Sequence, residues 1–286
     1  MASHIKEFVT DVLTGRTSLK IYLAKNFPSL FTLKTEESEE LKWGGVRFRA
    51  PRLRGHFTHE LVPILGERWY TGGRCDVENG DIVIDAGAHF GFFSYYALKK
   101  GARAIYAFEP NPYVFDVLAE HVKLWEAENK IYPLQKALYK EKGKIRLFVE
   151  ENRKSGVATV LSNRAYTVLS KFKYVETVDV DATTIDDFVS ENNIERVDFI
   201  KIDVEGSERE VIEGARETIK RFKPKLTISA YHKIARGVNE VTGHEFTFFP
   251  DLYELPELVL KIRADYTRIA KSRFAGDHFE IVVLMW

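Results

Sequence analysis

The sequence lacks several features that would assign a protein to a class at once. Cys75 is the only cysteine among its 286 residues, so no disulfide can form within the chain, and no Cys/His cluster has the spacing of a zinc site. No run approaches the roughly 18 apolar residues of a membrane span, and the first residues lack the apolar core of a signal peptide. We therefore expect a soluble, cytoplasmic protein without a membrane partner.

An excess of one sign of charge is also missing. The chain carries 42 lysines and arginines and 42 aspartates and glutamates, and no basic block stands out. The broad positive field of a nucleic-acid-binding protein is therefore absent, which favours a small-molecule substrate over a nucleic acid. Apolar residues make up 45% of the chain and charged residues 29%, as in globular proteins that bury a sizeable core.

Residues 1–75 differ in pattern from the rest, and we expect them to form an appendage of helices and a strand. Three roles stay open for it: a lid, a contact in a homodimer, or an element that recruits the substrate. Its predicted parts are helices over Ile5–Leu13, Leu19–Phe27 and Thr58–Tyr70, an acidic connector over Thr35–Glu40, and a half-exposed strand from Trp43 to Ala50.

Residues 76–286 are predicted to form one α/β domain. Short apolar runs alternate with segments of helical spacing, which is how a parallel sheet with crossover helices appears in sequence. Lys144–Val149 and Tyr174–Val180 instead alternate like strands, with Gly143 as a turn, so we expect an antiparallel insertion there. The runs are Ile82–Ile84, Ala104–Phe108, Ile131–Leu134, Val197–Ile202 and Leu226–Ser229, and the helical segments are Phe92–Lys100, Tyr113–Glu126 and Ser207–Phe222.

The strongest local motif is the segment from Asp85 to Phe92, DAGAHFGF, which joins an apolar run to a predicted helix. Glycine permits a sharp turn and a close approach of the backbone to a ligand, and the helix start offers free N–H groups. The G-x-G-x-x-G pattern of dinucleotide oxidoreductases is absent, because Gly87 and Gly91 are four apart and Asp85 precedes them. A carboxylate at that place would repel a pyrophosphate and suit a cationic ligand end, such as the amino group of S-adenosylmethionine.

Glu109 ends the second apolar run, just over twenty residues after the first glycine. Nucleotide-binding α/β folds place a carboxylate there on the ribose hydroxyls. A glutamate at this position favours an unphosphorylated ribose.

A third group of polar residues lies in the segment VDFIKIDVEGSE, from Val197 to Glu208. If the strand continues to its end, Lys201, Asp203 and Glu205 project from one side. Two interpretations compete: an ion pair between Lys201 and Asp203 at the rim of the sheet, or the wall of an active site, which we favour. His232 follows the Leu226–Ser229 run at the same predicted edge and is the best catalytic candidate among the histidines.

Five segments together resemble the FkbM-type methyltransferase family: IVIDAGAHFGFFS, AIYAFEPNP, ALYKEKGKIRL, TTIDDF and VDFIKIDVEGSEREVIEGA. The resemblance covers roughly residues 80–230. It implies a class I methyltransferase fold, Rossmann-like, with a mostly parallel seven-stranded sheet and helices on both faces. It also implies methyl transfer from S-adenosylmethionine to a hydroxyl, often on a sugar or a natural product.

The resemblance also implies roles for individual residues. Asp203 and Glu205 would stand nearest the methyl group. Lys201 and His232 are further catalytic candidates from their place in the sequence and not from the resemblance. The cofactor would lie on three segments: Asp85, Gly87, Ala88, His89, Gly91 and Phe92; Glu109, Pro110 and Asn111; and Gln135, Lys136 and Ala137 near the adenine.

Three alternatives stay open at this stage. A divalent metal on Asp203 and Glu205 would lower the pKa of the acceptor hydroxyl, but two carboxylates without a clear third ligand make it the less favoured mechanism. A nicotinamide-dependent oxidoreductase and a non-catalytic scaffold are the rival functions. The segment from Glu150 to Lys173 is interpreted as a mobile loop over the acceptor.

Overall fold

The structure is a computed structural model of the chain, and it describes residues 32–34, 38–43, 46–51, 64, 69–150, 158–159, 175–232, 235–238, 245–275 and 278–286. The helices predicted over Ile5–Leu13 and Leu19–Phe27 lie outside these ranges, as does most of the predicted acceptor loop. The domain boundary at residue 75 therefore stays a prediction. No helix among the described residues is long and apolar enough to cross a membrane.

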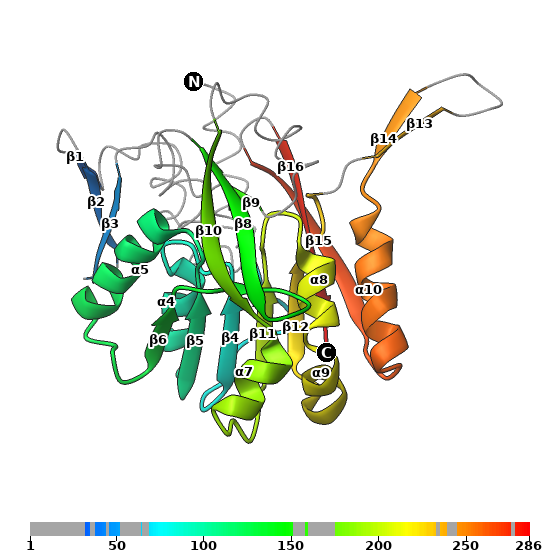
Figure 1. Cartoon of the computed structure of the whole chain (residues 1–286), viewed down its shortest axis with the longest axis horizontal. Coiled ribbons are helices and arrows are strands. Elements are labelled where there is room, and N and C mark those ends of the chain that lie inside the picture. The colour runs from blue at the N-terminus through cyan, green and yellow to red at the C-terminus, as the bar shows by residue number, and fades with distance from the viewer. Residues whose placement is uncertain are drawn as a thin grey trace, which may run out of the picture.

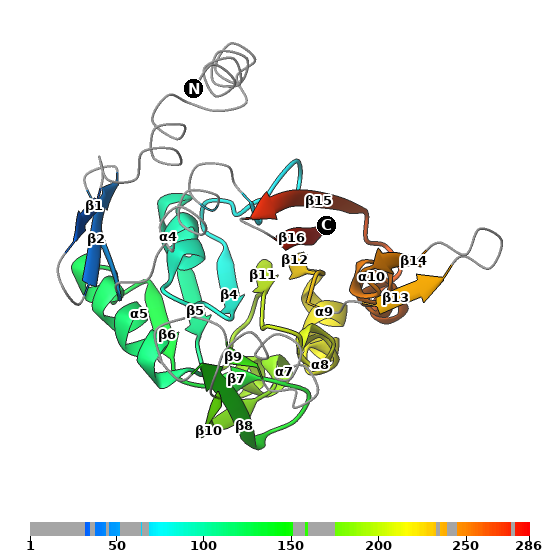
Figure 2. The same cartoon turned by 90° about the horizontal axis from the view of Figure 1, so that it is seen from above.

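Seven strands form the main sheet, in the order β15-β16-β12-β11-β4-β5-β6, and Figure 2 shows this order as an arc. Five adjacent strands pair parallel to one another: β12, β11, β4, β5 and β6. β16 runs antiparallel to both β12 and β15. The predicted mostly parallel α/β sheet is therefore confirmed. The strands are β4 (Ile82–Ala86), β5 (Ala104–Phe108), β6 (Ile131–Leu134), β11 (Phe199–Ile202), β12 (Lys225–Ser229), β15 (Arg268–Ala275) and β16 (His278–Met285).

Helices cover both faces of this sheet because its strands are apolar on both sides. In β4, Val83 contributes to a core with α4 and α5, and Ile84 to a second core with α7, α8, α9 and α10. Figure 2 shows the two groups of helices on opposite sides of the arc. The helices are α4 (Phe92–Lys99), α5 (Pro112–Leu124), α7 (Ile185–Glu191), α8 (Glu208–Glu213), α9 (Arg216–Phe222) and α10 (Asp251–Ile262).

The single helix predicted over Ser207–Phe222 is wrong, because the chain forms α8 and α9 with a break at Gly214. A Cβ at Gly214 would lie 2.1 Å from the backbone oxygen of Tyr139, so the helix passes close to another segment there. The carboxylate of Asp186 accepts hydrogen bonds from the N–H groups of Glu217 and Thr218, which satisfies the first turn of α9. These partners are distant in sequence, so helical spacing alone does not reveal the break.

The predicted antiparallel insertion is confirmed by a second sheet in the order β7-β10-β8-β9. Its long strands β8 and β10 pair antiparallel, with Val178 opposite Leu147, and Figure 1 shows them in front of the main sheet. Of the predicted acceptor loop, β9 is described, and it pairs with β8. The strands are β7 (Ala137–Leu138), β8 (Gly143–Glu150), β9 (Ala158–Thr159) and β10 (Val175–Thr183).

Two smaller sheets complete the described part of the chain. The predicted strand near Trp43 belongs to an N-terminal sheet, in which Phe48 of β3 is fully buried beside Phe92 of α4. The acidic connector predicted over Thr35–Glu40 is wrong for its second half, because Ser38 begins a strand paired on both sides. These sheets consist of β1 (Thr32–Lys34), β2 (Ser38–Trp43) and β3 (Val46–Pro51), and of β13 (Ala235–Val238) with β14 (Glu245–Phe248).

Candidate active site

The predicted site residues gather at one edge of the main sheet, where the parallel strands end. Asp85 is the second-last residue of β4, Glu109 follows β5, and Gln135 follows β6. Asp203 follows β11 and His232 lies just beyond β12, which is the neighbour of β11. Open α/β sheets bind their ligands at this edge, so the topology brings the predicted cofactor and catalytic residues together.

The glycine turn after β4 is held by contacts within the protein. Gly87, His89 and Gly91 all have positive φ values, of 76°, 52° and 83°. A Cβ at Gly87 would lie 1.8 Å from the carbonyl oxygen of Asp203, and a Cβ at Gly91 would lie 2.6 Å from a methyl group of Leu118. A side chain at either position would therefore collide with the protein itself, and the close approach of this backbone to a ligand stays a prediction.

Three further residues of the predicted cofactor set also pack against the protein. Ala88 and Phe92 are almost fully buried, and the ring of Phe92 lies 5.9 Å from that of Phe90. Asn111 caps the start of α5 by accepting a hydrogen bond from the N–H of Tyr113. For Gly91 and Phe92, contact with a cofactor stays a prediction about their backbone groups at the start of α4.

Asp85 forms a buried ion pair with Lys201. The two residues lie opposite each other on adjacent strands, and Lys201 Nζ is 3.2 Å from Asp85 Oδ1. Their side chains are 4% and 0% exposed, and Ser94 Oγ donates to Asp85 Oδ2 at 2.7 Å. Burial lowers the pKa of Lys201, but the carboxylates of Asp85 and Asp203 raise it by more. The pKa therefore lies above its usual value, and the amine stays charged.

This pair corrects one interpretation. The ion pair considered between Lys201 and Asp203 is replaced by one with Asp85, because the strand register sets Asp85 directly opposite the lysine. The carboxylate of Asp85 is fully buried beside this lysine, and its contact with the amino group of a ligand stays a prediction. Lys201 also donates to the carbonyl oxygen of Gly87, which ties the pair to the glycine turn.

Glu109 lies at the edge of the sheet just after β5, and its contact with a ribose stays a prediction. Its carboxylate accepts hydrogen bonds at 2.9 Å from the N–H groups of His89 and Asn111, which holds it at the sheet edge between the turns after β4 and β5. Burial raises its pKa, opposed by the nearby His89 and by these N–H groups. Each carboxylate oxygen keeps further acceptor capacity, so Glu109 fits the hydroxyls of a ribose.

The segment predicted near the adenine follows β6 on the next strand outward. The N–H of Glu109 donates to the carbonyl oxygen of Leu134 at 3.1 Å, so this segment borders the Glu109 turn, where Pro110 is half-buried. Gln135 and Lys136 are exposed there, whereas Ala137 is buried as the first residue of β7. Their contact with an adenine stays a prediction.

The strand β11 ends at Ile202, so the expectation that it continues through Glu205 is wrong. Glu205 and Gly206 have φ values of 54° and 107°, which form a tight turn before α8. A positive φ is costly for a residue with a side chain, and such strain concentrates at functional sites. The turn directs Glu205 and Asp203 toward His232.

Four residues form what we call the carboxylate–histidine cluster: Asp203, Glu205, Glu208 and His232. His232 Nε2 lies 3.6 Å from Asp203 Oδ1 and 3.4 Å from Glu205 Oε2, and its Nδ1 lies 2.8 Å from Glu208 Oε1. The exposed fraction of the side chain is 1% for Glu208, 6% for His232, 13% for Asp203 and 32% for Glu205. Glu205 is therefore the member most open to a substrate.

The mutual charges in the cluster shift its pKa values. Burial lowers the pKa of His232, but Glu208 and Glu205 together raise it to about 10, so the ring is a cation at neutral pH in this state. Burial raises the pKa of Glu205 to about 7, with His232 opposing the shift. Burial also raises the pKa of Asp203, but Lys201 and His232 lower it below the usual value. The pKa of Glu208 is likewise raised by burial and lowered below the usual value by His232.

Sequence reasoning missed two residues at this site. Glu208 was interpreted only as part of a helix. Its carboxylate accepts hydrogen bonds from the N–H groups of Val204 and Gly206, and these bonds close the turn that carries Glu205. Tyr70 donates from its hydroxyl to Asp203 Oδ2, and Lys201 Nζ lies 5.3 Å from the centre of its ring. Glu208 stands in the quoted motif and was open to discovery, whereas nothing in the sequence places Tyr70 here.

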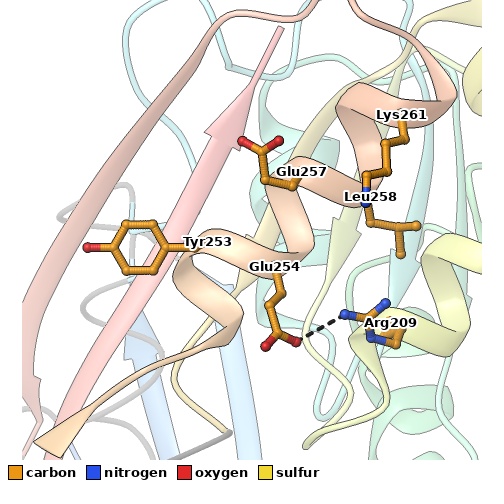
Figure 3. Close-up of a pocket in the computed structure, with 6 residues that line it drawn as sticks. All are labelled: Arg209, Tyr253, Glu254, Glu257, Leu258 and Lys261. Carbon is orange, nitrogen blue, oxygen red and sulfur yellow. Dashed lines mark hydrogen bonds and ion pairs between the residues drawn. The ribbon is translucent and has the colours of Figure 1, made fainter.

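A cavity of about 250 Å³ lies apart from this cluster, on the outer side of α8 and α10. Figure 3 shows the ion pair between Arg209 and Glu254 that spans the two helices, with Tyr253 pointing to one side. None of its lining residues belongs to the cluster. The pair connects α8 to α10 at the surface.

Comparison with known proteins assigns the arrangement to a family. The model of the methyltransferase FkbM domain matches residues 85–264, from Asp85 through the carboxylate–histidine cluster and beyond. The chain belongs to the FkbM methyltransferase family. An FkbM methyltransferase is a transferase, so the nicotinamide-dependent oxidoreductase is set aside.

Three relatives illustrate the likeness. The chain is 31% identical to methyltransferase sdnD of Sordaria araneosa over 164 residues, which cover 50% of this chain and 63% of that protein. It is 26% identical to the 31-O-demethyl-FK506 methyltransferase FkbM of Streptomyces tacrolimicus over 209 residues, covering 64% and 79%. The crystal structure of methyltransferase FkbM from Methylobacillus flagellatus superposes with a TM-score of 0.52 at 21% identity, covering 74% of this chain and 44% of that one. That structural likeness shows the fold.

Proposed function

We propose that this FkbM methyltransferase moves a methyl group from S-adenosylmethionine to a hydroxyl of a small molecule or a carbohydrate. The observation that carries the proposal is the position of the carboxylate–histidine cluster, which abuts the glycine turn through the contact between Gly87 and Asp203. One group of residues suits the cofactor and the other suits removal of a hydroxyl proton. Methyl transfer to an oxygen atom is further supported by a relative, the 31-O-demethyl-FK506 methyltransferase FkbM.

The residues that would hold the cofactor fit it in two respects. The Glu109 carboxylate is fixed at the sheet edge by two backbone N–H groups, ready to accept from ribose hydroxyls. The start of α4 presents its first-turn N–H groups after a turn with three positive φ values. When bound, S-adenosylmethionine supplies an electrophilic methyl group on sulfur.

Glu205 is our candidate for the base, because it is the most exposed carboxylate of the cluster and lies 3.4 Å from His232. The acceptor oxygen forms its bond to the methyl carbon while the sulfur–methyl bond breaks, and the hydroxyl proton passes to the carboxylate of Glu205. S-adenosylhomocysteine leaves with the electron pair of the broken bond. The protein contributes mainly by aligning the acceptor with the methyl group and accepting the proton.

Binding and transfer are tested separately. Calorimetry with S-adenosylhomocysteine should show one site per chain, and an acceptor screen with labelled S-adenosylmethionine should yield products whose label is on oxygen. Glu205→Gln should lower turnover about 10²–10⁴-fold, the usual contribution of a general base, with unchanged cofactor affinity. The matched control is Glu257→Gln, on the outer side of α10, where the carboxylate is 53% exposed. Absence of binding, or equal turnover in the two variants, would contradict the proposal.

A further inference from the structure

The carboxylate–histidine cluster gathers three carboxylates around one histidine. Asp203, Glu205 and Glu208 each place a carboxylate oxygen within 3.6 Å of a ring nitrogen of His232. The nearby Lys201 forms its ion pair with Asp85, outside the cluster. Buried charges are stable only when they are paired or bound to a metal, so the cluster is suited to a further cation.

Atoms without hydrogen bonds point to the same conclusion. The side chain of His232 is only 6% exposed, and among the described residues no hydrogen bond of adequate geometry reaches its Nε2. Asp203 Oδ1, which faces His232, also lacks one. Buried polar atoms are nearly always satisfied, so unsatisfied ones that face each other indicate an absent partner.

The geometry points to a divalent cation site formed by Asp203, Glu208 and His232, which we propose as a new metal site of this protein. One ligand atom from each residue can be chosen so that all three lie within 4.8 Å of one another. Metal bonds to nitrogen and oxygen are about 2.0–2.2 Å long, so such atoms can share one ion after small movements of their side chains. The sequence interpretation placed a metal on Asp203 and Glu205 without a third ligand. In the proposed site Asp203 is retained, and Glu208 and His232 complete a set of three.

The donor set defines the kind of ion. Two carboxylates and one imidazole suit first-row divalent cations such as Mn²⁺ or Zn²⁺, whereas Mg²⁺ prefers oxygen ligands and retains its waters. The carboxylates of Asp203 and Glu208 would supply negative charge to the ion, and the neutral imidazole of His232 would supply a nitrogen lone pair. Three protein ligands would leave further coordination positions for water or an acceptor oxygen. Glu205, the most exposed member of the cluster, lies 3.4 Å from His232.

The role of the ion rests on the proposed function, although its binding does not. A cation at the ends of β11 and β12 would bind the acceptor oxygen and lower the pKa of its hydroxyl. Glu205 would then accept the proton from a more acidic group. The two carboxylates and the histidine would act by holding the ion, and Tyr70 by orienting Asp203 through its hydrogen bond.

The test is titration of the chelator-treated full chain with Mn²⁺, followed by calorimetry and by the electron paramagnetic resonance signal of free Mn²⁺. We expect one Mn²⁺ per chain and a loss of affinity of at least about tenfold in Glu208→Gln and His232→Gln. Glu208→Gln keeps an oxygen that accepts from Val204 and Gly206, so it should preserve the turn. Glu257→Gln, an exposed carboxylate on α10, is the control and should bind Mn²⁺ like the unaltered protein.

Binding of S-adenosylhomocysteine to the same preparations reports folding and separates the two proposals. Loss of Mn²⁺ with retained S-adenosylhomocysteine binding in Glu208→Gln supports the site. Normal Mn²⁺ affinity in that variant, or an unaltered protein that binds S-adenosylhomocysteine but neither Mn²⁺ nor Zn²⁺, overturns the metal site and leaves the methyltransferase proposal standing. If Glu208→Gln fails to fold, Asp203→Asn takes its place under the same criteria. Mn²⁺ binding without S-adenosylhomocysteine binding would uphold the site and refute the proposed function.

Discussion

The buried pair of Asp85 and Lys201 gives a prediction whose size follows from its burial. Asp85→Asn removes the negative charge and leaves the Lys201 ammonium, 4% exposed, beside a neutral amide. Removing one partner of a buried ion pair costs about 3–5 kcal/mol, because the remaining charge is left uncompensated. Lys201 keeps its bond to the Gly87 carbonyl, which favours the lower end of that range. At about 2–4 °C per kcal/mol, the melting temperature should fall by at least about 6 °C.

The control is a pair of the same chemistry on the surface. Lys144 and Asp181 lie 2.9 Å apart on β8 and β10, with 72% and 61% of their side chains exposed. Exposed pairs contribute about 0–1 kcal/mol, so Asp181→Asn should change the melting temperature by less than about 4 °C. Combining Asp85→Asn with Lys201→Met should recover part of the stability, because no unpaired charge is then buried.

Thermal melts and urea titrations of the four proteins, followed by tryptophan fluorescence, measure these differences. Calorimetry with S-adenosylhomocysteine on each protein completes the experiment. An Asp85→Asn variant as stable as Asp181→Asn would refute the assignment of the buried pair. Unchanged stability together with weaker cofactor binding would show instead that Asp85 contacts the cofactor directly.

Three further predictions address single positions. Glu109→Ala should weaken S-adenosylhomocysteine binding, measured by calorimetry, about 10- to 150-fold, because a hydrogen bond to a charged group is worth about 1.5–3 kcal/mol. A loss confined to acceptor affinity would contradict the ribose assignment. Gly87→Ala should destabilise the fold, because its Cβ meets the Asp203 carbonyl, whereas Gly80→Ala, also at positive φ but with nothing within 4 Å, should cost much less in a thermal melt; equal losses would refute the clash. Cys75 is fully buried, and burial raises its pKa to about 12. Its thiol should therefore react with a disulfide reagent on the order of 10³-fold more slowly in the folded protein than in urea. A fast reaction in the folded protein would contradict this burial.

The elements of the main sheet were predictable because their signals are local. The runs Ala104–Phe108 and Ile131–Leu134 coincide with β5 and β6, since a buried parallel strand is a short apolar run bounded by polar residues. The order of Asp85, Glu109, Asp203 and His232 along successive strands was also sufficient to place them at one edge. The positions of these side chains along the chain thus determine the location of the site.

The contacts inside the site were not predictable because they depend on strand order and register. Lys201 has Asp203 two residues away, yet it pairs with Asp85, which is 116 positions earlier and becomes its neighbour only when β11 pairs with β4. Alternation predicted that Glu205 shares a face with Asp203, but the left-handed turn at Glu205 brings both to His232 by another route. The close contact at Gly87 depends on the same pairing, because its Cβ position is blocked by the Asp203 backbone, which lies more than a hundred residues later in the chain.

The contacts between the turns after β4 and β11 explain why these residues belong to one unit. The N–H of Asp203 donates to the carbonyl oxygen of Ala86 at 3.1 Å, and Lys201 donates to that of Gly87. The segment that we assign to the methyl donor and the segment that we assign to the proton acceptor are therefore in direct backbone contact. Methyl transfer needs the acceptor oxygen, the methyl carbon and the sulfur in line, and misplacement by about 1 Å can cost 10²-fold in rate. Gly87, which admits the Asp203 carbonyl, and Lys201, which bonds to the Gly87 carbonyl, hold the two segments together, as such an alignment would require.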